Sequence, residues 1–189
     1  TAAALAVQYS CSPREVGHNH LQVLQALLMD DDAYLPGFTR PVAELSRSAS
    51  LTVTRGNAQP LRSGIDRMIG AADNGWWASP NDMALYTFDT AKAISQIRLV
   101  FDSNQADTKR MPCWYPKEGT DVDMPPMLPR TFAIEIQDNT GTWQRVQQVE
   151  ENASRLVKLS LSTEAGAVRF VPLRTWGAEQ AHIMGFEIS

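Results

Sequence analysis

The residues best suited to chemistry in this sequence are aromatic and stand beside polar side chains. Trp76 and Trp77 are adjacent, while Trp114 and Tyr115 follow Arg110 in a long segment without periodicity. An aromatic face packs on the apolar face of a sugar ring, and a guanidinium supplies a planar fork of hydrogen-bond donors. These residues are therefore candidates for ligand binding, and the alternative is that the tryptophans belong to a hydrophobic core.

Metal binding and acid–base catalysis have weaker support. Asp121 and Asp123 place oxygen donors at alternate positions, which suits calcium, although a solvated acidic loop is the alternative. His18 and His20 diverge on a helix and have no third ligand nearby, so we expect a polar linker there. His182 alternates with apolar residues, which favours a surface or half-buried strand position over a catalytic base. The sequence offers no catalytic residue.

Composition narrows the class of protein. The chain has 189 residues, of which 43% are hydrophobic, so it can bury a full core and we expect one domain with an appendage. Its 17 basic residues are scattered among 21 acidic ones, which argues against nucleic-acid binding. Cys11 and Cys113 lie in no metal-binding or redox spacing, so inert thiols are favoured, with a disulfide as the alternative. The sequence does not indicate a cellular compartment.

The second part of the chain has the period of β-strands. Apolar and polar residues alternate, or form short apolar runs, at 49–55, 83–89, 95–102, 131–138, 142–149, 155–162, 167–173 and 182–189. Eight strands without intervening helices predict an antiparallel β-sandwich or barrel. The residues expected in its core or in buried strands are Leu99, Phe101, Ile134, Ile136, Leu159, Phe170 and Phe186.

The first part of the chain has the period of helices. The apolar helix expected over Thr1 to Tyr9 is too short to span a bilayer. Ser12 and Glu15 form a capping box around Pro13, which starts a second helix. Asn19 is expected to cap a third helix, which carries a leucine stripe and ends at the acidic run from Asp30.

Residues 64–101 contain the motifs GIDRMIG, GWWAS and MALYTFDTAKAISQIRLVFDS. They resemble the discoidin or coagulation-factor type C family, which has a galactose-binding-like jelly roll. The resemblance implies a discoidin-like β-sandwich over residues 46–189, with carbohydrate binding as a function of such folds. It also implies that Trp77 packs into the sandwich, which leaves Trp76 as the ligand candidate. The terminal disulfide of the extracellular members has no counterpart here.

Residues 1–37, TAAALAVQYSCSPREVGHNHLQVLQALLMDDDAYLPG, are similar to the end of the flavin-binding region in a family of FAD-dependent oxidoreductases. The resemblance implies that residues 1–45 are a helical remnant and linker of a flavin domain, and that FAD belongs to a parent flavoprotein. This chain has no GxGxxG fingerprint, so we expect no FAD on the fragment and no catalysis by it.

Two functions follow from these resemblances. The first is a C-terminal accessory domain of an FAD-dependent oxidoreductase, which docks on the upstream flavin domain or presents substrate to it. The alternative is a carbohydrate-binding module with a glycan partner. Docking predicts exposed apolar side chains on the helices, which would also allow self-association, whereas a module should bind glycans alone.

Overall fold

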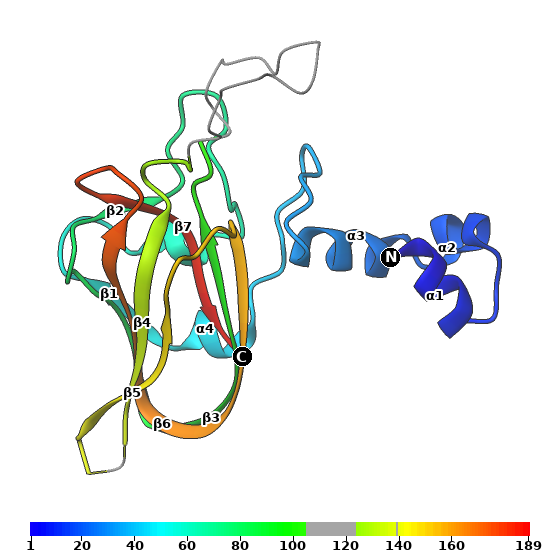
Figure 1. Ribbon diagram of the computed structural model, residues 1–189. Helices are drawn as coiled ribbons and strands as arrows, with labels where there is room; N and C mark the ends of the chain where they lie inside the picture. Colours follow the sequence, from blue (N-terminus) through cyan, green and yellow to red (C-terminus); the bar gives the residue numbers. More distant parts are fainter. Residues whose placement is uncertain (105–123, 139) are drawn as a thin grey trace. The chain divides into compact units, whose positions relative to one another are not determined.

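The computed structural model describes residues 1–104, 124–138 and 140–189. It divides into two compact units, Thr1–Val42 and Ala43–Ser189 (Figure 1). The sequence predicted the division between residues 45 and 46. The structure assigns helix α4, Glu44–Ser48, to the second unit because Ser46 Oγ donates to the carbonyl oxygen of Ile188 at 2.9 Å and accepts from its N–H at 2.7 Å.

The first unit contains helices α1 (Ala2–Gln8), α2 (Pro13–Asn19) and α3 (Leu21–Asp30). The predicted capping box is confirmed: Glu15 N–H donates to Ser12 Oγ at 3.3 Å, and Ser12 N–H donates to Glu15 Oε2 at 2.7 Å. These bonds satisfy donors that a helix N-terminus leaves free. A small core joins α1 to α2 through Leu5, Ala6 and Val16. Among the described residues, no helix is both long enough and apolar enough to cross a membrane.

The predicted cap at Asn19 is wrong. Helix α2 continues through Asn19, so the residue that precedes α3 is His20, and its side chain makes no capping hydrogen bond. The imidazole of His20 instead stacks on the ring of Tyr9, with centroids 3.9 Å apart. The side chain of His20 therefore makes an aromatic contact with the residue that follows α1 and does not cap α3.

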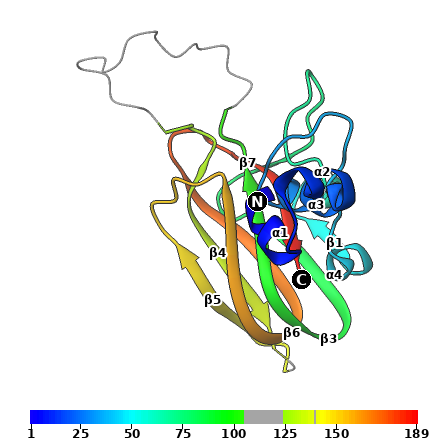
Figure 2. The ribbon, with the colours of Figure 1, turned by 90° about the vertical axis from the view of Figure 1, so that its right-hand side faces the viewer.

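The second unit is an antiparallel β structure, as predicted. Its remaining elements are β1 (Ser50–Val53), a 3-10 helix η1 (Gln59–Arg62), β2 (Trp76–Ala78), β3 (Ala84–Phe101), β4 (Pro129–Gln137), β5 (Trp143–Val149), β6 (Leu156–Thr175) and β7 (Ala181–Ile188). The strand order is β2-β7-β3-β6-β4-β5, with β1 paired to β3. Figure 2 shows β5, β4, β6 and β3 side by side.

Two long strands fold this sheet into two layers. The predicted strands 83–89 and 95–102 are one strand, β3, and the predicted strands 155–162 and 167–173 are one strand, β6. The first half of β3 pairs with β1, and its second half pairs with β7. Register shifts between these halves mark bulges, which bend a strand without a turn (Figure 1).

The core lies between the two layers and is rich in aromatic rings. Tyr86 contacts Phe186 with ring centroids 5.0 Å apart, and Phe101 contacts Phe132 at 5.3 Å. Phe170 contacts rings from both layers. Of the core residues predicted from the sequence, Leu159 is half-buried and packs against the core, and the others are buried.

A charged pair anchors the segment that leads into β2. Asp66 and Arg98 form an ion pair of 2.9 Å, with side chains only 8% and 5% exposed. A Cβ on Gly185 would lie 3.0 Å from Asp66 Oδ1, so glycine at this position leaves room for the carboxylate. Arg155 also donates to the carbonyl oxygens of Phe101 and Asp66. These contacts fix the segment on which the candidate site depends.

A second charged network lies on strands β4, β5 and β6. Glu135 accepts from Arg145 at 3.0 Å and from Arg169 at 2.6 Å, and the Arg169 guanidinium lies 4.1 Å from the centre of the Trp143 ring. Burial raises the pKa of Glu135, but the hydrogen bonds and charges of the two arginines outweigh it, so the pKa is lowered overall.

Candidate binding site

A groove lies at the end of the sandwich where β1 ends and where β2 and β7 begin. Its volume is about 340 Å³, and its lining residues are Arg55, Gly56, Asn57, Gly75, Trp76, Trp77 and Gln180. Three segments that are distant in the sequence therefore meet there. The groove combines an aromatic wall with donors and acceptors, which is the usual composition of a small-molecule site.

The two tryptophans have the opposite orientations from those expected. Trp76 is 3% exposed and belongs to the core, whereas Trp77 is 42% exposed. Successive residues of a strand point to opposite faces, and on β2 the inward positions are Trp76 and Ala78. Trp76 Nε1 donates to the carbonyl oxygen of Arg55 at 2.8 Å, which satisfies the buried indole. Trp77 thus supplies the exposed aromatic surface, and a ligand role for Trp76 stays a prediction.

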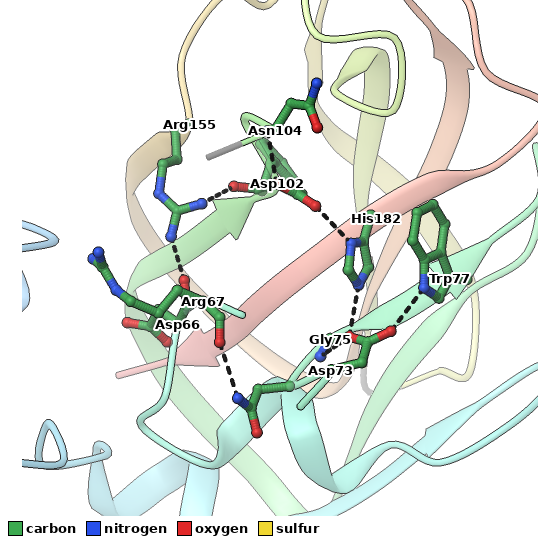
Figure 3. Close-up of polar contacts among 11 residues, drawn as sticks. Asp66, Arg67, Asp73, Gly75, Trp77, Asp102, Asn104, Arg155 and His182 are labelled. Carbon is green, nitrogen blue, oxygen red and sulfur yellow. Dashed lines mark hydrogen bonds and ion pairs between the residues drawn. The ribbon is translucent and has the colours of Figure 1, made fainter. Parts of the chain in front are cut away.

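The imidazole of His182 lies beside the indole of Trp77 (Figure 3). The two residues are cross-strand partners on β2 and β7, and their rings stack at 3.9 Å with an angle of 9° between planes. His182 is 1% exposed, so the expectation of a surface or half-buried residue is wrong. The reason is that β7 lies between β2 and β3, and that Trp77 covers the imidazole. The imidazole therefore supports one face of the indole.

Two carboxylates hold the imidazole by its two nitrogens. Nδ1 of His182 lies 2.8 Å from Asp102 Oδ2, and Nε2 lies 3.0 Å from Asp73 Oδ1 (Figure 3). Asp73 also accepts from Trp77 Nε1 at 2.9 Å and from Gly75 N–H at 2.9 Å. Asp73 therefore joins the imidazole, the indole and the backbone of the groove.

Both carboxyl groups have lowered pKa values. Burial raises the pKa of Asp73, but hydrogen bonds from Trp77 and Gly75 and the charge of His182 outweigh it. Burial likewise raises the pKa of Asp102, but hydrogen bonds from His182 and from Asn104 N–H outweigh it, and the charge of Arg155 adds to them. Both groups are therefore carboxylates near neutral pH.

Polar side chains also line the groove. The Arg55 guanidinium, largely exposed, pairs with Asp82 Oδ2 at 2.9 Å, and Asp82 also accepts from the N–H of Ser79 at 2.8 Å. Because the carboxylate of Asp82 is buried and held by the backbone, it orients the arginine. Asn57 and Gln180 add neutral amides to the same groove.

Several predicted site residues lie outside the described part of the chain. They are Arg110, Trp114, Tyr115, Asp121 and Asp123, together with Cys113. Over residues 1–104, 124–138 and 140–189, no group of three or more His, Cys, Asp or Glu side chains could hold a metal ion. The cluster around His182 had no signal in the sequence, because its carboxylates are 80 and 109 positions away.

The fold has clear structural relatives, although no protein-family model and no curated protein matches the sequence. The family 32 carbohydrate-binding module of Streptococcus pneumoniae EndoD is similar with a TM-score of 0.56 and 11% identity, over 78% of this chain and 99% of that one. The family 32 module of Clostridium perfringens NanJ, solved with galactose, has a TM-score of 0.51 and 12% identity, over 78% and 97%. A chitosan-binding module from Paenibacillus sp. IK-5, solved with chitotriose, has a TM-score of 0.52 and 10% identity, over 77% and 98%.

These likenesses establish a galactose-binding-like fold, as the sequence predicted. They agree with the predicted discoidin-like jelly roll, and at 10–12% identity the likeness concerns the fold alone. None of these relatives shows a flavoenzyme parent, so that resemblance remains a hypothesis.

Proposed function

We propose that the second unit is a carbohydrate-binding module and that the groove beside Trp77 is its glycan site. The observation that carries the proposal is an exposed indole that stacks on a buried imidazole and lines a groove together with polar side chains. Family 32 modules with the same fold, one of them solved with galactose, support it by analogy.

The groove has the two properties that sugar recognition needs. The face of Trp77 opposite His182 offers an apolar platform for the C–H face of a pyranose ring. Arg55, Asn57 and Gln180 line the same groove and can exchange hydrogen bonds with hydroxyl groups. Because Asp73 fixes the indole N–H, little side-chain entropy is lost when the sugar stacks.

The test is calorimetric titration of the full chain with galactose, with N-acetylgalactosaminyl-β-1,3-galactose and with chitotriose. We expect at least one sugar to bind, and Trp77→Ala to weaken that binding at least tenfold, or about 1.4 kcal/mol. Trp143→Phe, on β5, is the matched control and should bind as the natural chain does. The proposal fails if no sugar binds at millimolar concentrations, or if the Trp77 variant binds equally well.

The accessory role remains a second candidate, because the first unit exposes many apolar side chains. Val7 is 82% exposed and Phe38 is 55% exposed, and the other exposed large apolar residues of the unit are Tyr9, Leu21, Val23, Leu27 and Tyr34. Monomeric proteins rarely leave extended apolar patches exposed. We propose that this unit docks on the flavin domain of an FAD-dependent oxidoreductase, as its resemblance implies, and that FAD belongs to that domain.

This second proposal has its own test. The purified chain should show no flavin absorbance, with or without added FAD, and should self-associate through its helices. Deletion of residues 1–42 should leave the second unit folded and abolish the self-association. Flavin bound to the chain, or an unchanged oligomer after the deletion in sedimentation, would contradict the docking role.

A further inference from the structure

We propose that Asn74 is a modification site beside the groove: its side chain loses ammonia, the product takes up water to become isoaspartate, and sugar binding is disabled. The hydrogen bonds of the folded chain slow this reaction. The inference rests on the proposed glycan site only for the effect on binding, and the reaction itself is tested without a sugar.

The reaction needs an asparagine followed by glycine, and Asn74 with Gly75 is the one such pair in the sequence. The backbone nitrogen of Gly75 attacks Cγ of Asn74. The new N–Cγ bond closes a five-membered succinimide, the Cγ–Nδ2 bond breaks, and ammonia leaves with the proton of the Gly75 N–H. Water then adds to one of the two imide carbonyl carbons, which gives aspartate or isoaspartate. Glycine is the most permissive partner, because it has no Cβ to hinder the approach.

The structure requires glycine at position 75. A Cβ there would lie 2.3 Å from Nε2 of His182 and 3.0 Å from the carbonyl oxygen of Ile183. The backbone of Gly75 is therefore in close contact with strand β7, and any other residue would displace the imidazole or the strand. The labile pair cannot be avoided by a larger residue at this position.

The amide of Asn74 closes the loop that precedes β2. Its Nδ2 donates to the carbonyl oxygen of Arg67 at 3.0 Å. Within the same loop, the backbone groups of Ile69 and Ala72 bond to each other in both directions, at 3.1 and 3.0 Å. A carboxylate at position 74 has no N–H to donate and would face a carbonyl oxygen. The reaction therefore removes a hydrogen bond that joins the two ends of the loop.

Isoaspartate also lengthens the backbone at a critical place. Its main chain runs through Cβ and Cγ, so one extra atom lies between Asp73 and Gly75. Asp73 accepts from the N–H of Gly75 at 2.9 Å and from Nε1 of Trp77 at 2.9 Å. Because the close contact with His182 prevents Gly75 from moving toward β7, the extra atom must shift Asp73 or β2. The indole then loses its acceptor and must be ordered again by the ligand, which lowers affinity.

The folded chain slows the attack at both reacting groups. The Gly75 nitrogen must give up its proton, but its N–H donates to Oδ1 of Asp73 (Figure 3). Burial raises the pKa of Asp73, but hydrogen bonds from Trp77 and Gly75 lower it overall, so the carboxylate is too weak a base to remove an amide proton. The leaving amide is held by Arg67. The reaction should therefore proceed through local opening of the loop.

The first experiment follows the conversion by mass spectrometry of peptides from the full chain, folded or in concentrated guanidinium chloride. In the unfolded chain, Asn74 should convert faster than Asn57, which precedes Ala58. Folding should slow Asn74 about tenfold or more, because the loop must open first. Asp73→Ala should bring the folded rate closer to the unfolded rate. Glu44→Ala, which removes an exposed carboxylate from α4, is the control and should not.

The second experiment measures sugar binding by the converted chain. It carries one more negative charge than the fresh chain, so ion exchange separates the two after ageing in warm, mildly alkaline buffer. Its affinity for galactose, or for whichever of the three sugars binds, should be about tenfold weaker. Sugar present during ageing should slow the conversion, because a ligand stabilises the closed loop. Asn74→Gln should keep the affinity with which it starts, since its longer side chain closes a six-membered ring much more slowly.

The outcomes separate this inference from the proposed function. Conversion of Asn74 no faster than that of Asn57 in the unfolded chain overturns the modification site, and equal rates in the folded and unfolded chain overturn the protection. A converted chain that binds sugar as tightly as the fresh chain overturns the effect on the groove. If neither chain binds a sugar, the glycan site fails. The indole N–H signal of Trp77 in nitrogen-15 NMR then decides the effect on the groove, which is overturned if conversion leaves that signal unchanged.

Discussion

Replacing Arg98 with methionine tests whether the buried ion pair holds the segment that carries the site. Methionine fills a similar volume but removes the charge that faces Asp66 at 2.9 Å. The carboxylate is 8% exposed, so water cannot take the place of the guanidinium. The segment from Asp66 to Asp73 should then lose its main anchor on β3.

The expected loss follows from the burial of both partners. Removing one member of a buried ion pair costs about 3–5 kcal/mol, because the remaining charge stays in a poorly solvated place. In a domain of about 150 residues, each kcal/mol lowers the melting temperature by about 2–4 °C. Arg98→Met should therefore unfold about 10 °C below the natural chain. Asp66→Asn combined with Arg98→Met removes both charges and should recover most of the loss.

Tryptophan fluorescence during urea or thermal unfolding is a suitable assay, since all five tryptophans lie in the second unit. Arg145→Met is the matched control: its guanidinium is well exposed, so its loss should cost less than about 1 kcal/mol. The reasoning is refuted if Arg98→Met is as stable as Arg145→Met. It is also refuted if the double variant is no more stable than Arg98→Met.

Three further predictions concern single sites. Ser12→Ala should destabilise the helical unit by about 1 kcal/mol, measured by circular dichroism, because the capping box is lost. Gly75→Ala should destabilise the second unit by about 1–3 kcal/mol in thermal unfolding, because the added Cβ would overlap the His182 ring. Gly17→Ala is the control and should be tolerated, because nothing lies within 4 Å of a Cβ at that position. The lowered pKa of Glu135 means that its stabilisation is present above pH 4.5 and is lost as the pH falls below that value. Urea unfolding at a series of acidic pH values should show this loss in the natural chain, and Glu135→Gln should show less of it.

Local patterns predicted much of the fold. Alternation located β1, β4, β5 and β7 to within a few residues, because a strand with one buried face shows its period in the sequence. The sequence also predicted the capping box at Ser12, since both of its hydrogen bonds form within four consecutive residues. Asn19 failed as a cap because the end of one helix and the start of the next compete for the same residues.

The sequence did not predict that β3 and β6 are each one long, bent strand. Their alternation is interrupted where register shifts occur, which looks in the sequence like the end of one strand and the start of another. Whether such a break is a turn or a bulge depends on the pairing partners, and these come from distant parts of the chain.

The sequence by itself predicted the helices of the first unit and most strands of the second, but neither helix α4 nor strand β2, and the discoidin resemblance implied one inward and one outward indole in the aromatic pair before Ala78. Only the tertiary structure decided which indole is which, because alternation fixes the period of a strand but not its phase. The same holds for the carboxylates around His182: Asp102 and Asp73 reach it through the pairing of β7 with β3 and β2. A site formed by residues 80 and 109 positions apart exists only once the strands that carry or flank them are paired.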